Sequence, residues 1–449
     1  MGEIRDPIYG FIITPTEGIE LKIINTSIFQ RLRRIKQLAM AYLVYPGANH
    51  TRFDHSLGVF YLASLMAEKL FDGRDNEEKR RTIRLAALLH DIGHGPFSHI
   101  SEDLLEQYSD INTVSREKIH ELITLDLINS NEELKKLLSP DEREKIIGIL
   151  SGKRPGFSLM KNIISGPLDA DKMDYLLRDS YFCGVKYGVF DYHRLFNTLT
   201  SYDDGGDRYI AVNFDGINSL EQFVLAKYYM TMQVYRHKIR SIIDSMIVRG
   251  VELGIEKDNL DFLKNIYTYE NTDKYRENYL KYNDDNLLFE ITSNKNASKG
   301  KEIFERLLSR QLFKQVFSEK LSSLEANEEV KNKLINIADK DSKDFRKKLE
   351  NQIAEKMRIE ADFVIANTVK VKSVKEMSRD SEGKIMIIGK DKKLKEFQEE
   401  STIFKSIDES MKDINFEVYA PVVYNTTIEK SKTLEPIKTK ILELLKTKK

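Results

Sequence analysis

Three short segments of the sequence combine histidines, carboxylates and basic residues at spacings that suit chemistry at a metal ion. They are residues 50–56 (HTRFDHS), 90–99 (HDIGHGPFSH) and 169–179 (DADKMDYLLRD). All eight histidines lie between residues 50 and 237, so any histidine chemistry belongs to the first part of the chain. Imidazole and carboxylate ligands suit Mn, Fe, Zn or Ni, with Mg possible at the carboxylates. These segments therefore predict a divalent metal site.

The middle segment gives the strongest indication of that site. His90 and Asp91 follow the apolar run 85–89, which predicts that they end a buried helix, where an unpaired carboxylate is costly. His94 lies four residues after His90 and so near the same helix face. On its own the pair could also be a histidine capped by its neighbour. His55 upstream and the acidic third segment downstream favour the metal.

The third segment also offers cations beside these ligands. Lys172 and Arg178 lie on the same predicted helix as its aspartates. A metal ion with phosphate-binding cations beside it indicates hydrolysis of a phosphate ester or anhydride.

Other polar and aromatic groups have plainer interpretations. We expect His50 and His193 to be surface or capping residues. Arg31, Arg33 and Arg34 are either an anion site or a solvated helix face. The tyrosine-rich run 267–282 is expected to pack in the core rather than to stack on a base.

Composition and charge exclude several classes of protein. The 449 residues are 41% hydrophobic and 10% aromatic, which is enough for a large core and excludes whole-chain disorder. The 71 basic and 71 acidic residues cancel, which removes the simplest argument for nucleic-acid binding and leaves only a local basic groove open.

The one cysteine excludes an internal disulfide and a thiolate cluster. No apolar run reaches the roughly 18 residues of a membrane span, and the first residues lack a signal-peptide pattern, so we expect a cytoplasmic protein without a membrane partner.

A helical scaffold must position these groups. Hydrophobic periodicity predicts helices over 19–38, 55–71, 77–92, 115–150, 166–180 and 220–253, then from 300 to 358 and at the end of the chain. Strands are predicted in hairpins at 8–13 and 197–213, and at 363–366 and 385–388. We therefore predict a mainly α fold with small β-hairpins, followed by an α+β C-terminal region. The predicted division is a catalytic core over 1–250 and a helical and α+β region over 251–449 with a regulatory or oligomerising role.

In this order, the three segments resemble the HD-domain metal-dependent phosphohydrolases. The longer motifs at 47–59, 90–99, 169–179 and 235–238 are similar to those of one branch of that family, the deoxynucleoside triphosphate (dNTP) triphosphohydrolases. The resemblance covers about residues 4–250, with a looser similarity at 355–395. It implies an HD-domain helical core in which a metal-activated water attacks the α-phosphorus and releases a deoxynucleoside and intact triphosphate.

The resemblance also implies a role for individual side chains. The metal ligands would be His55, His90, Asp91 and Asp171. Proton donors or phosphate partners would be His94, His99 and His120, supported by Glu102 and Glu121. His99 is the candidate acid for the leaving 5′-oxygen, a role suited to a pKa near neutrality. The substrate would be held by Gln37, Leu38, Arg52, Lys172, Tyr175, Asp179, Lys227 and Tyr235, with Arg52 and Lys172 on the triphosphate and Gln37, Asp179 and Tyr235 around the deoxyribose.

A second nucleotide site is implied at a subunit interface, because this branch often forms tetramers that nucleotide stabilises. The residues that would build it, with dNTP or GTP as the activator, are Gln30, Arg33, Lys370, Lys372 and Lys390. The alternative is that these lysines are only a solvated surface. Two positions depart from the branch. Lys227 stands where the branch often has an arginine that binds the triphosphate, and a lysine keeps the charge but cannot make the bidentate contact. Asn25 stands where the vertebrate enzyme has an aspartate that recognises guanine in its activator site.

Three functions are compatible with the sequence. The leading hypothesis is a dNTP triphosphohydrolase. The second is an HD phosphohydrolase or nuclease that acts on another phosphate ester, such as a cyclic nucleotide, a nucleoside monophosphate or single-stranded nucleic acid. The third is a nucleotide-sensing protein whose pocket only binds.

Overall fold

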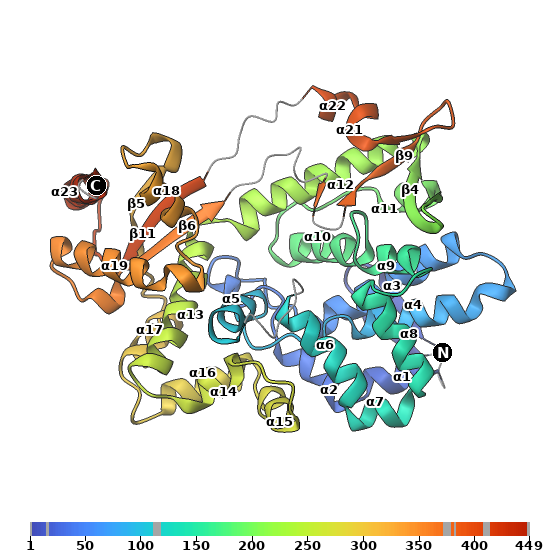
Figure 1. Ribbon diagram of the computed structural model, residues 1–449, viewed down its shortest axis with the longest axis horizontal. Helices are drawn as coiled ribbons and strands as arrows, with labels where there is room; N and C mark the ends of the chain where they lie inside the picture. Colours follow the sequence, from blue (N-terminus) through green and yellow to red (C-terminus); the bar gives the residue numbers. More distant parts are fainter. Residues whose placement is uncertain are drawn as a thin grey trace.

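The computed structural model describes residues 2–14, 18–110, 118–370, 379–380, 383–406 and 414–446. Figure 1 shows a mainly helical molecule with small sheets, which confirms the predicted fold class. Residue 250 falls inside a helix, Lys238–Glu256, so the division into 1–250 and 251–449 stays a prediction. Among the described residues, no helix is both long and apolar enough to cross a membrane.

The helices of the first part surround a long buried helix, α3 (Arg52–Leu70). Its first turn is fixed by Asp54, which accepts a hydrogen bond from the Thr51 backbone N–H at 2.8 Å. α3 packs against α4 (Glu77–Leu89), which ends just before the second segment, and against α10 (Ala170–Phe182), which carries most of the third. The further helices are α1 (Ile19–Ile24), α2 (Ser27–Gln30), η1 (Arg31–Arg34), η2 (Ala41–Leu43), η3 (Arg74–Asn76), α5 (His99–Tyr108), α6 (Ile119–Ser130), α7 (Glu132–Leu137), α8 (Pro140–Ser151), α9 (Ser158–Ile164) and α11 (Tyr192–Thr198).

Two of the predicted helices are wrong in outline. The segment 19–38 is not one helix but α1, α2 and η1, because Asn25 ends the first and Thr26 caps the second. The segment 220–253 is also divided. α12 (Ile217–Met230) passes into a π-turn, η6 (Thr231–Tyr235), and α13 (Lys238–Glu256) begins after Arg236 and His237. The sequence 231–237 has no Pro or Gly to signal that break.

The chain opens with a hairpin that lies slightly outside its predicted position. β1 (Gly2–Asp6) pairs antiparallel with β2 (Gly10–Thr14). Oδ1 of Asp6 accepts the backbone N–H groups of Ile8 and Tyr9, which folds the turn, and Gly10 has a positive φ of 77° that favours glycine.

A four-stranded sheet joins residues far apart in the chain. Its order is β10-β9-β4-β3. β3 (Leu199–Asp204) and β4 (Asp207–Asn213) form the predicted second hairpin, and β9 (Met386–Ile388) runs parallel to β4. β10 (Leu394–Glu396) closes the far edge, and α21 (Phe397–Glu400) and α22 (Thr402–Lys405) lie near it (Figure 1). The short helix η5 (Phe214–Gly216) directly follows β4.

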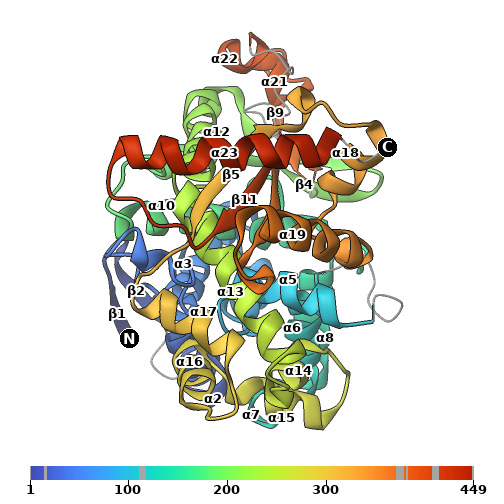
Figure 2. The same ribbon diagram turned by 90° about the vertical axis from the view of Figure 1, so that its left-hand side faces the viewer.

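A three-stranded antiparallel sheet with the order β5-β11-β6 forms the second part of the C-terminal region. β5 (Lys314–Lys320) lies within the stretch 300–358 that was predicted to be helical, and that prediction is wrong there. β11 (Ile414–Ala420) was not predicted, and β6 (Ile365–Lys370) was. Helices α18 (Glu328–Ile335), α19 (Lys343–Met357) and α23 (Thr427–Lys446) enclose a hydrophobic cluster with this sheet that is separate from the main core. Figure 2 shows α23 lying across its outer side.

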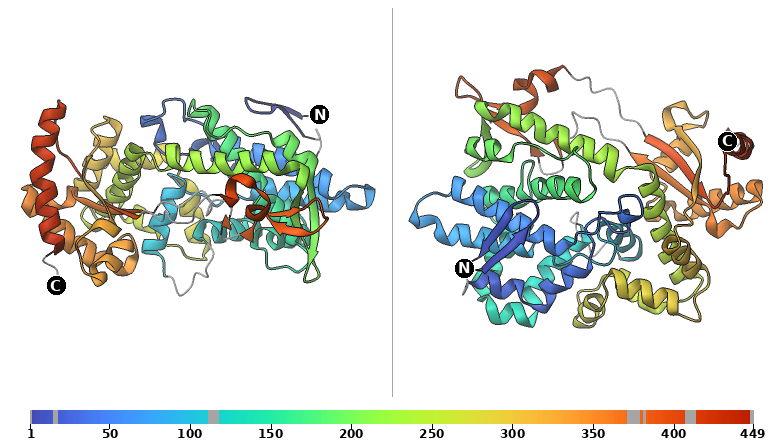
Figure 3. Two further views of the ribbon diagram at one scale, coloured as in Figure 1. Left: turned by 90° about the horizontal axis from the view of Figure 1, so that it is seen from above. Right: turned by 180° about the vertical axis from the view of Figure 1, so that it is seen from behind.

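The remaining elements connect the two cores. α13 packs along α17 (Lys299–Leu308) and also contacts β6. The right-hand view of Figure 3 shows α13 between the N-terminal helices and the three-stranded sheet. The other elements are α14 (Asp261–Tyr267), α15 (Asp273–Lys281), α16 (Asp284–Ser293), η7 (Leu321–Ser323), η8 (Lys340–Ser342), η9 (Ala361–Phe363), β7 (Arg379–Asp380) and β8 (Gly383–Lys384). The tyrosines of 267–282 include Tyr267, Tyr275 and Tyr279 in the buried core, which confirms the packing interpretation.

Candidate active site

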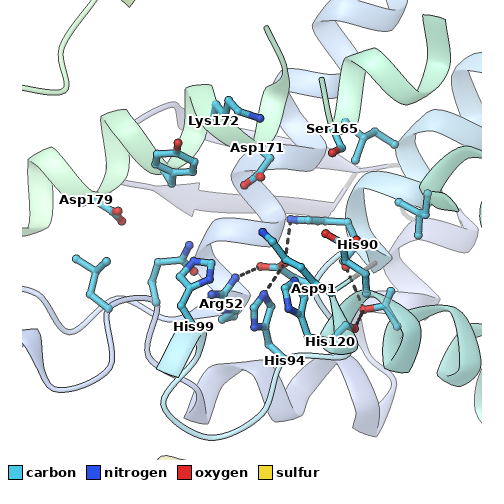
Figure 4. Close-up of a pocket in the computed structure, with 18 of the residues that line it drawn as sticks. Arg52, His90, Asp91, His94, His99, His120, Ser165, Asp171, Lys172 and Asp179 are labelled. Carbon is cyan, nitrogen blue, oxygen red and sulfur yellow. Dashed lines mark hydrogen bonds and ion pairs between the residues drawn. The ribbon is translucent and has the colours of Figure 1, made fainter. Parts of the chain in front are cut away.

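Four side chains predicted to bind metal come together where α3, α4 and α10 meet. His55 lies on α3, His90 and Asp91 follow the last turn of α4, and Asp171 lies in the first turn of α10. Ligand atoms of His55, His90 and Asp91 all lie within 4.8 Å of one another, and Nε2 of His55 is 3.0 Å from Oδ1 of Asp171. Figure 4 shows Asp171 on α10 facing His90 and Asp91.

The two histidines are oriented for metal binding by their other ring nitrogens. Nδ1 of His55 is 2.8 Å from Oδ2 of Asp174, and Nδ1 of His90 is 2.7 Å from the carbonyl oxygen of Ala87. Partners of this kind fix the tautomer that leaves Nε2 free to coordinate. Within the described part of the chain, Nε2 of His90 is buried and makes no hydrogen bond. This donor set fits a divalent cation.

Asp174 and Arg178 support the site from behind. Arg178 donates to both oxygens of Asp174, at 2.9 and 3.0 Å, and to Asp6 at 2.9 Å, and its side chain is 0% exposed. Tyr9 adds a hydrogen bond to Asp174 at 2.8 Å. The prediction that Arg178 is a phosphate-binding cation beside the metal is therefore wrong, because its charge is used to hold Asp174.

Arg52 is fixed on the wall of the site by an unusual backbone turn. Nη1 of Arg52 is 2.5 Å from Oδ2 of Asp91, and its Nε donates to Oγ of Ser98 at 2.6 Å. Phe97 and Ser98 both have positive φ values, 64° and 59°, a conformation rarely adopted by residues other than glycine. Asp284 stabilises the turn, because its carboxylate accepts the Phe97 backbone N–H at 2.8 Å.

Three histidines lie beside Arg52 on the same wall (Figure 4). The rings of His94 and His120 stack with centroids 4.0 Å apart, and His99 meets His94 edge-on. Nδ1 of His120 is 2.5 Å from Glu102. The lack of a side chain at Gly93 lets α6 pack closely against this turn, since a Cβ there would lie 2.3 Å from the carbonyl oxygen of His120.

Local charge changes the acidity of these groups. Desolvation and the positive charge of Arg52 lower the pKa of His94 and His99 well below the ordinary value. The expectation of a near-neutral pKa for His99 is therefore wrong for the protein without a ligand. Burial disfavours the charge on Asp91, but the neighbouring Arg52 and His90 hold its pKa well below the usual range.

Asp179 marks the other end of the site. Its two carboxylate oxygens lie 2.7 Å from Nε2 of His50 and 2.7 Å from the hydroxyl of Tyr235. Desolvation, with Asp179 beside it, raises the pKa of Tyr235 well above its usual value. His50 is buried and stacks on Phe182, so its interpretation as a surface or capping residue is wrong. The signal was available in the sequence, since His50 begins the same segment as His55.

One cavity of about 690 Å³ connects these groups. Its lining contains these predicted residues: Gln37, Leu38, Arg52, His90, Asp91, His94, His99, His120, Glu121, Asp171, Lys172, Tyr175, Asp179, Lys227 and Tyr235. His55 and Glu102 lie behind the wall, where they contact Asp171 and His120. Sequence reasoning missed Lys118, Thr124, Leu125, Leu150, Ser151, Lys161, Ile164, Ser165 and Arg240. Thr124 and Leu125 lie within α6, in a stretch that was predicted to be helical, but no motif marked their side chains as facing the cavity. Lys161 and Ile164 lie on α9, which was not predicted, and the others lie at or next to helix ends.

The predicted regulatory residues lie in three separate places. Arg33 donates to Oε1 of Gln30 at 2.8 Å and stacks over Phe53, near the first helices. Lys370 ends β6 in the three-stranded sheet, and Lys390 follows β9 in the four-stranded sheet. Lys372 lies outside the described residues. Within one chain these positions form no common cluster in the described residues, so a shared site would need a second copy.

The three arginines near residue 31 also divide. Arg31 donates to the backbone oxygens of His94 and Tyr282, both at 2.9 Å, so it is a structural clamp and neither an anion site nor a solvated group. Arg33 and Arg34 are exposed.

Comparison with known proteins gives two matches to family descriptions. Residues 52–179 match the HD domain, and residues 190–440 match the HD associated region, which is more than half of the chain. The first match begins at Arg52 and ends at Asp179, and both residues line the cavity described above.

Individual relatives extend these matches. An uncharacterized protein of Methanocaldococcus jannaschii is 42% identical over 58% of this chain and 51% of its own length, so the match spans about half of that relative. The deoxynucleoside triphosphate triphosphohydrolase SAMHD1 of Homo sapiens is 30% identical over 70% of this chain and 55% of its own. The crystal structure of a phosphohydrolase from Bacteroides thetaiotaomicron superposes with a TM-score of 0.71 at 29% identity, covering 93% of this chain and 99% of that one.

Proposed function

The chain belongs to the HD-domain family of metal-dependent phosphohydrolases, and from this premise we propose that it hydrolyses dNTPs to a deoxynucleoside and intact triphosphate. The observation that carries the proposal is the wall formed by α10. Asp171, Tyr175 and Asp179 follow one another at intervals of four residues and all line the cavity. At a rise of 1.5 Å per residue, the metal end and the Asp179 end are about 12 Å apart, room for a nucleotide between them.

The charges of the cavity support a polyanionic substrate. Six basic side chains line it: Arg52, Lys118, Lys161, Lys172, Lys227 and Arg240. The acidic side chains of the lining are Asp91, Glu121, Asp171 and Asp179, and two of these are metal ligands in this proposal. Lys172 also forms an ion pair with Asp169 at 2.6 Å. A triphosphate beside the metal would gain favourable contacts with the basic side chains of this lining.

His55, His90, Asp91 and Asp171 would hold the divalent cation. When bound, the cation supplies Lewis-acid activation of a phosphoryl group and of a water molecule. Arg52, held rigidly by Asp91 and Ser98, presents its guanidinium to phosphate oxygens without having to reorganise.

The proton for the leaving 5′-oxygen would come from His99. Without a ligand, burial and then the positive charge of the neighbouring Arg52 lower the pKa of this imidazole. A bound triphosphate would offset that positive charge and favour the protonated imidazole, so substrate binding itself would prepare the acid. Glu102 would orient His120 for a supporting role on the phosphate.

The deoxyribose would lie against Asp179 and Tyr235. Asp179 can accept a further hydrogen bond from a sugar hydroxyl, since each carboxylate oxygen has two lone pairs. The Tyr235 ring would pack against the sugar and leave no room for a 2′-hydroxyl, with Gln37 and Tyr175 beside it.

The experiment is to incubate the protein with each dNTP and Mn or Mg, and to resolve the products by anion exchange. We expect deoxynucleoside and intact triphosphate. Pyrophosphate or a nucleoside monophosphate would instead support an HD phosphohydrolase of another ester, and tight binding without turnover across several metals would support a nucleotide sensor. The His90→Ala variant is the negative control, and His193→Ala, at an exposed histidine, is its matched partner.

We also propose a cytoplasmic homo-tetramer that dNTP or GTP stabilises. Gln30 and Arg33 of one subunit and Lys370 and Lys390 of others would meet at a nucleotide. The support is the exposed position of Arg33, Lys370 and Lys390.

A further inference from the structure

Arg240 is a charged side chain on the cavity wall, and two of its buried donor nitrogens have no hydrogen-bond partner among the described residues. It lies in the first turn of α13, is 7% exposed and lines the cavity. Within the described part of the chain, its buried Nε and Nη1 atoms have no hydrogen-bond partner. The carboxylate of Asp244 is 3.4 Å from Nε, an ion pair without hydrogen-bond geometry. Buried donors of this kind are costly unless something accepts from them.

Its neighbours place Arg240 at the end of the cavity away from the metal. The guanidinium carbon is 5.7 Å from the centre of the Tyr235 ring, and the Tyr235 hydroxyl contacts Asp179. Asp179 is two turns of α10 beyond Asp171. A ligand whose phosphates lie at the metal and whose sugar lies at Asp179 would therefore extend its base toward Arg240.

We propose that Arg240 is a specificity-determining residue that reads the base and selects guanine. The inference rests on the proposed function. Guanine offers two adjacent acceptors, O6 and N7, which match the fork of an arginine side chain. Adenine offers N7 beside an exocyclic amino group, so one guanidinium donor would face another donor and only one hydrogen bond could form. The exocyclic amino group of cytosine would face a guanidinium donor in the same way. A positive charge alone would not distinguish guanine from adenine or cytosine, whereas two parallel hydrogen bonds to O6 and N7 would.

The test compares kcat/KM for four substrates: dGTP, dITP, 7-deaza-dGTP and dATP. dITP keeps O6 and N7 but lacks the 2-amino group, and 7-deaza-dGTP lacks N7. The wild-type protein is expected to prefer dGTP and dITP over dATP by at least about fivefold, the lower limit for a good bidentate contact. 7-Deaza-dGTP should fall below dGTP, because one of the two acceptors is gone.

The variants separate base reading from charge and from folding. Arg240→Met should bring all four substrates to within about twofold of one another, and Arg240→Lys should keep the charge but lose most of the preference. Arg236→Met is the matched control, since Arg236 is half-buried in the same helix break and does not line the cavity. Its substrate ratios should equal those of the wild type.

Equal rates on dGTP and dATP in the wild type, or an Arg240→Met variant that keeps the wild-type ratio, would overturn the inference while leaving dNTP hydrolysis intact. If no dNTP is hydrolysed, the proposed function fails, and calorimetric binding of dGTP and dATP then tests base reading by itself. A dGTP preference in binding that disappears in Arg240→Met would support Arg240 as the reader. Equal binding would overturn it.

Discussion

Nδ1 of His55 and Oδ2 of Asp174 lie 2.8 Å apart, and both side chains are fully buried. Asp174 is held in turn by Arg178, so the position of a metal-site histidine depends on an ion pair that never reaches the cavity. A protein that needed only to bury these charges could have replaced them by apolar groups at little cost. Their presence here is explained by the orientation of His55.

Gly58→Ala should disturb this arrangement without removing any ligand. A Cβ at Gly58 would lie 1.8 Å from Oδ1 of Asp174 and 2.5 Å from Nη2 of Arg178, so the carboxylate must move. Loss of such a supporting contact weakens metal binding by about 10–100-fold. Metal titration followed by calorimetry measures this. Ser64→Ala on the same helix loses only a bond to its own helix and should bind metal as the wild type does.

Replacing His90 and Asp91 together by alanine should abolish both metal binding and turnover. Two ligands are lost at once, and the cluster of His55, His90 and Asp91 cannot be rebuilt from other described side chains. Metal content per chain after dialysis, measured beside product formation, checks both effects. Full activity of a metal-free preparation would contradict the assignment of the site.

Tyr235→Phe should weaken the sugar end of the site. The change removes a 2.7 Å hydrogen bond to the Asp179 carboxylate and keeps the ring. Because hydrogen bonds to charged groups contribute about 1.5–3 kcal/mol, kcat/KM should fall by roughly tenfold or more. The same ring should still exclude ribonucleotides, so dATP is expected to be cleaved far faster than ATP. Tyr181→Phe, at an exposed tyrosine on α10, is the control, and comparable rates of the wild type on ATP and dATP would refute the steric argument.

The Cys183 thiol should be unreactive in the folded protein at neutral and mildly alkaline pH. Burial, with Asp179 nearby, raises its pKa to about 12. Alkylation needs the thiolate, so at pH 8 the folded thiol should react more than about a hundredfold more slowly than the unfolded one, whose pKa is about 8.5. Because folding raises the pKa of this thiol, the folded state prefers the neutral thiol over the thiolate. The resulting contribution of Cys183 to the stability of the fold is present below about pH 8.5 and is lost as the pH rises toward 12.

Iodoacetamide labelling from pH 7 to 11, with and without urea, measures both states of the thiol. In urea the rate should level off above about pH 9, whereas the native rate should still be rising at pH 11. Equal native and unfolded rates at pH 8 would show that Cys183 is accessible.

Nucleotide addition should change the assembly of the protein. A nucleotide that binds only the assembled form must shift the oligomer equilibrium by mass action. Sedimentation across a titration with dNTP or GTP should show a heavier species, up to a tetramer, together with a higher specific activity. The double variant Arg33→Ala with Lys390→Ala should reduce that response and leave basal turnover in place. A monomer with hyperbolic kinetics at every concentration would contradict this prediction.

Much of the candidate site could be predicted from the sequence, because most of its residues lie close together in short motifs. His90, Asp91 and His94 are fixed by one helix end and one glycine turn, so their proximity follows from the sequence itself. His50 was misjudged because its partner, Asp179, is 129 residues away, and no local pattern reports a contact of that range. Arg178 was misjudged for two reasons: its partner Asp6 is 172 residues away, and its i,i+4 pairing with Asp174 on the same helix was overlooked.

The same limit applies to the fold. Amphipathic helices such as α4 were predicted correctly in type, since a single face must be buried. β5 and β11 were missed because a strand of seven residues is defined by its neighbours: Phe416 pairs with Glu319 on one side and with Thr368 on the other. Their pairing depends on tertiary structure that the polar sequence of β5 does not reveal.

The break between α12 and α13 has a mechanical consequence. Tyr235 ends the π-turn and Arg240 lies in the first turn of the following helix, so these two cavity-lining side chains are on opposite sides of the break. α12 packs on α10, whereas α13 packs on α17 and β6 of the C-terminal region and also on α5. A small rotation of α13 relative to α12 would therefore move Arg240 relative to Tyr235 and change the width of the cavity between these two side chains.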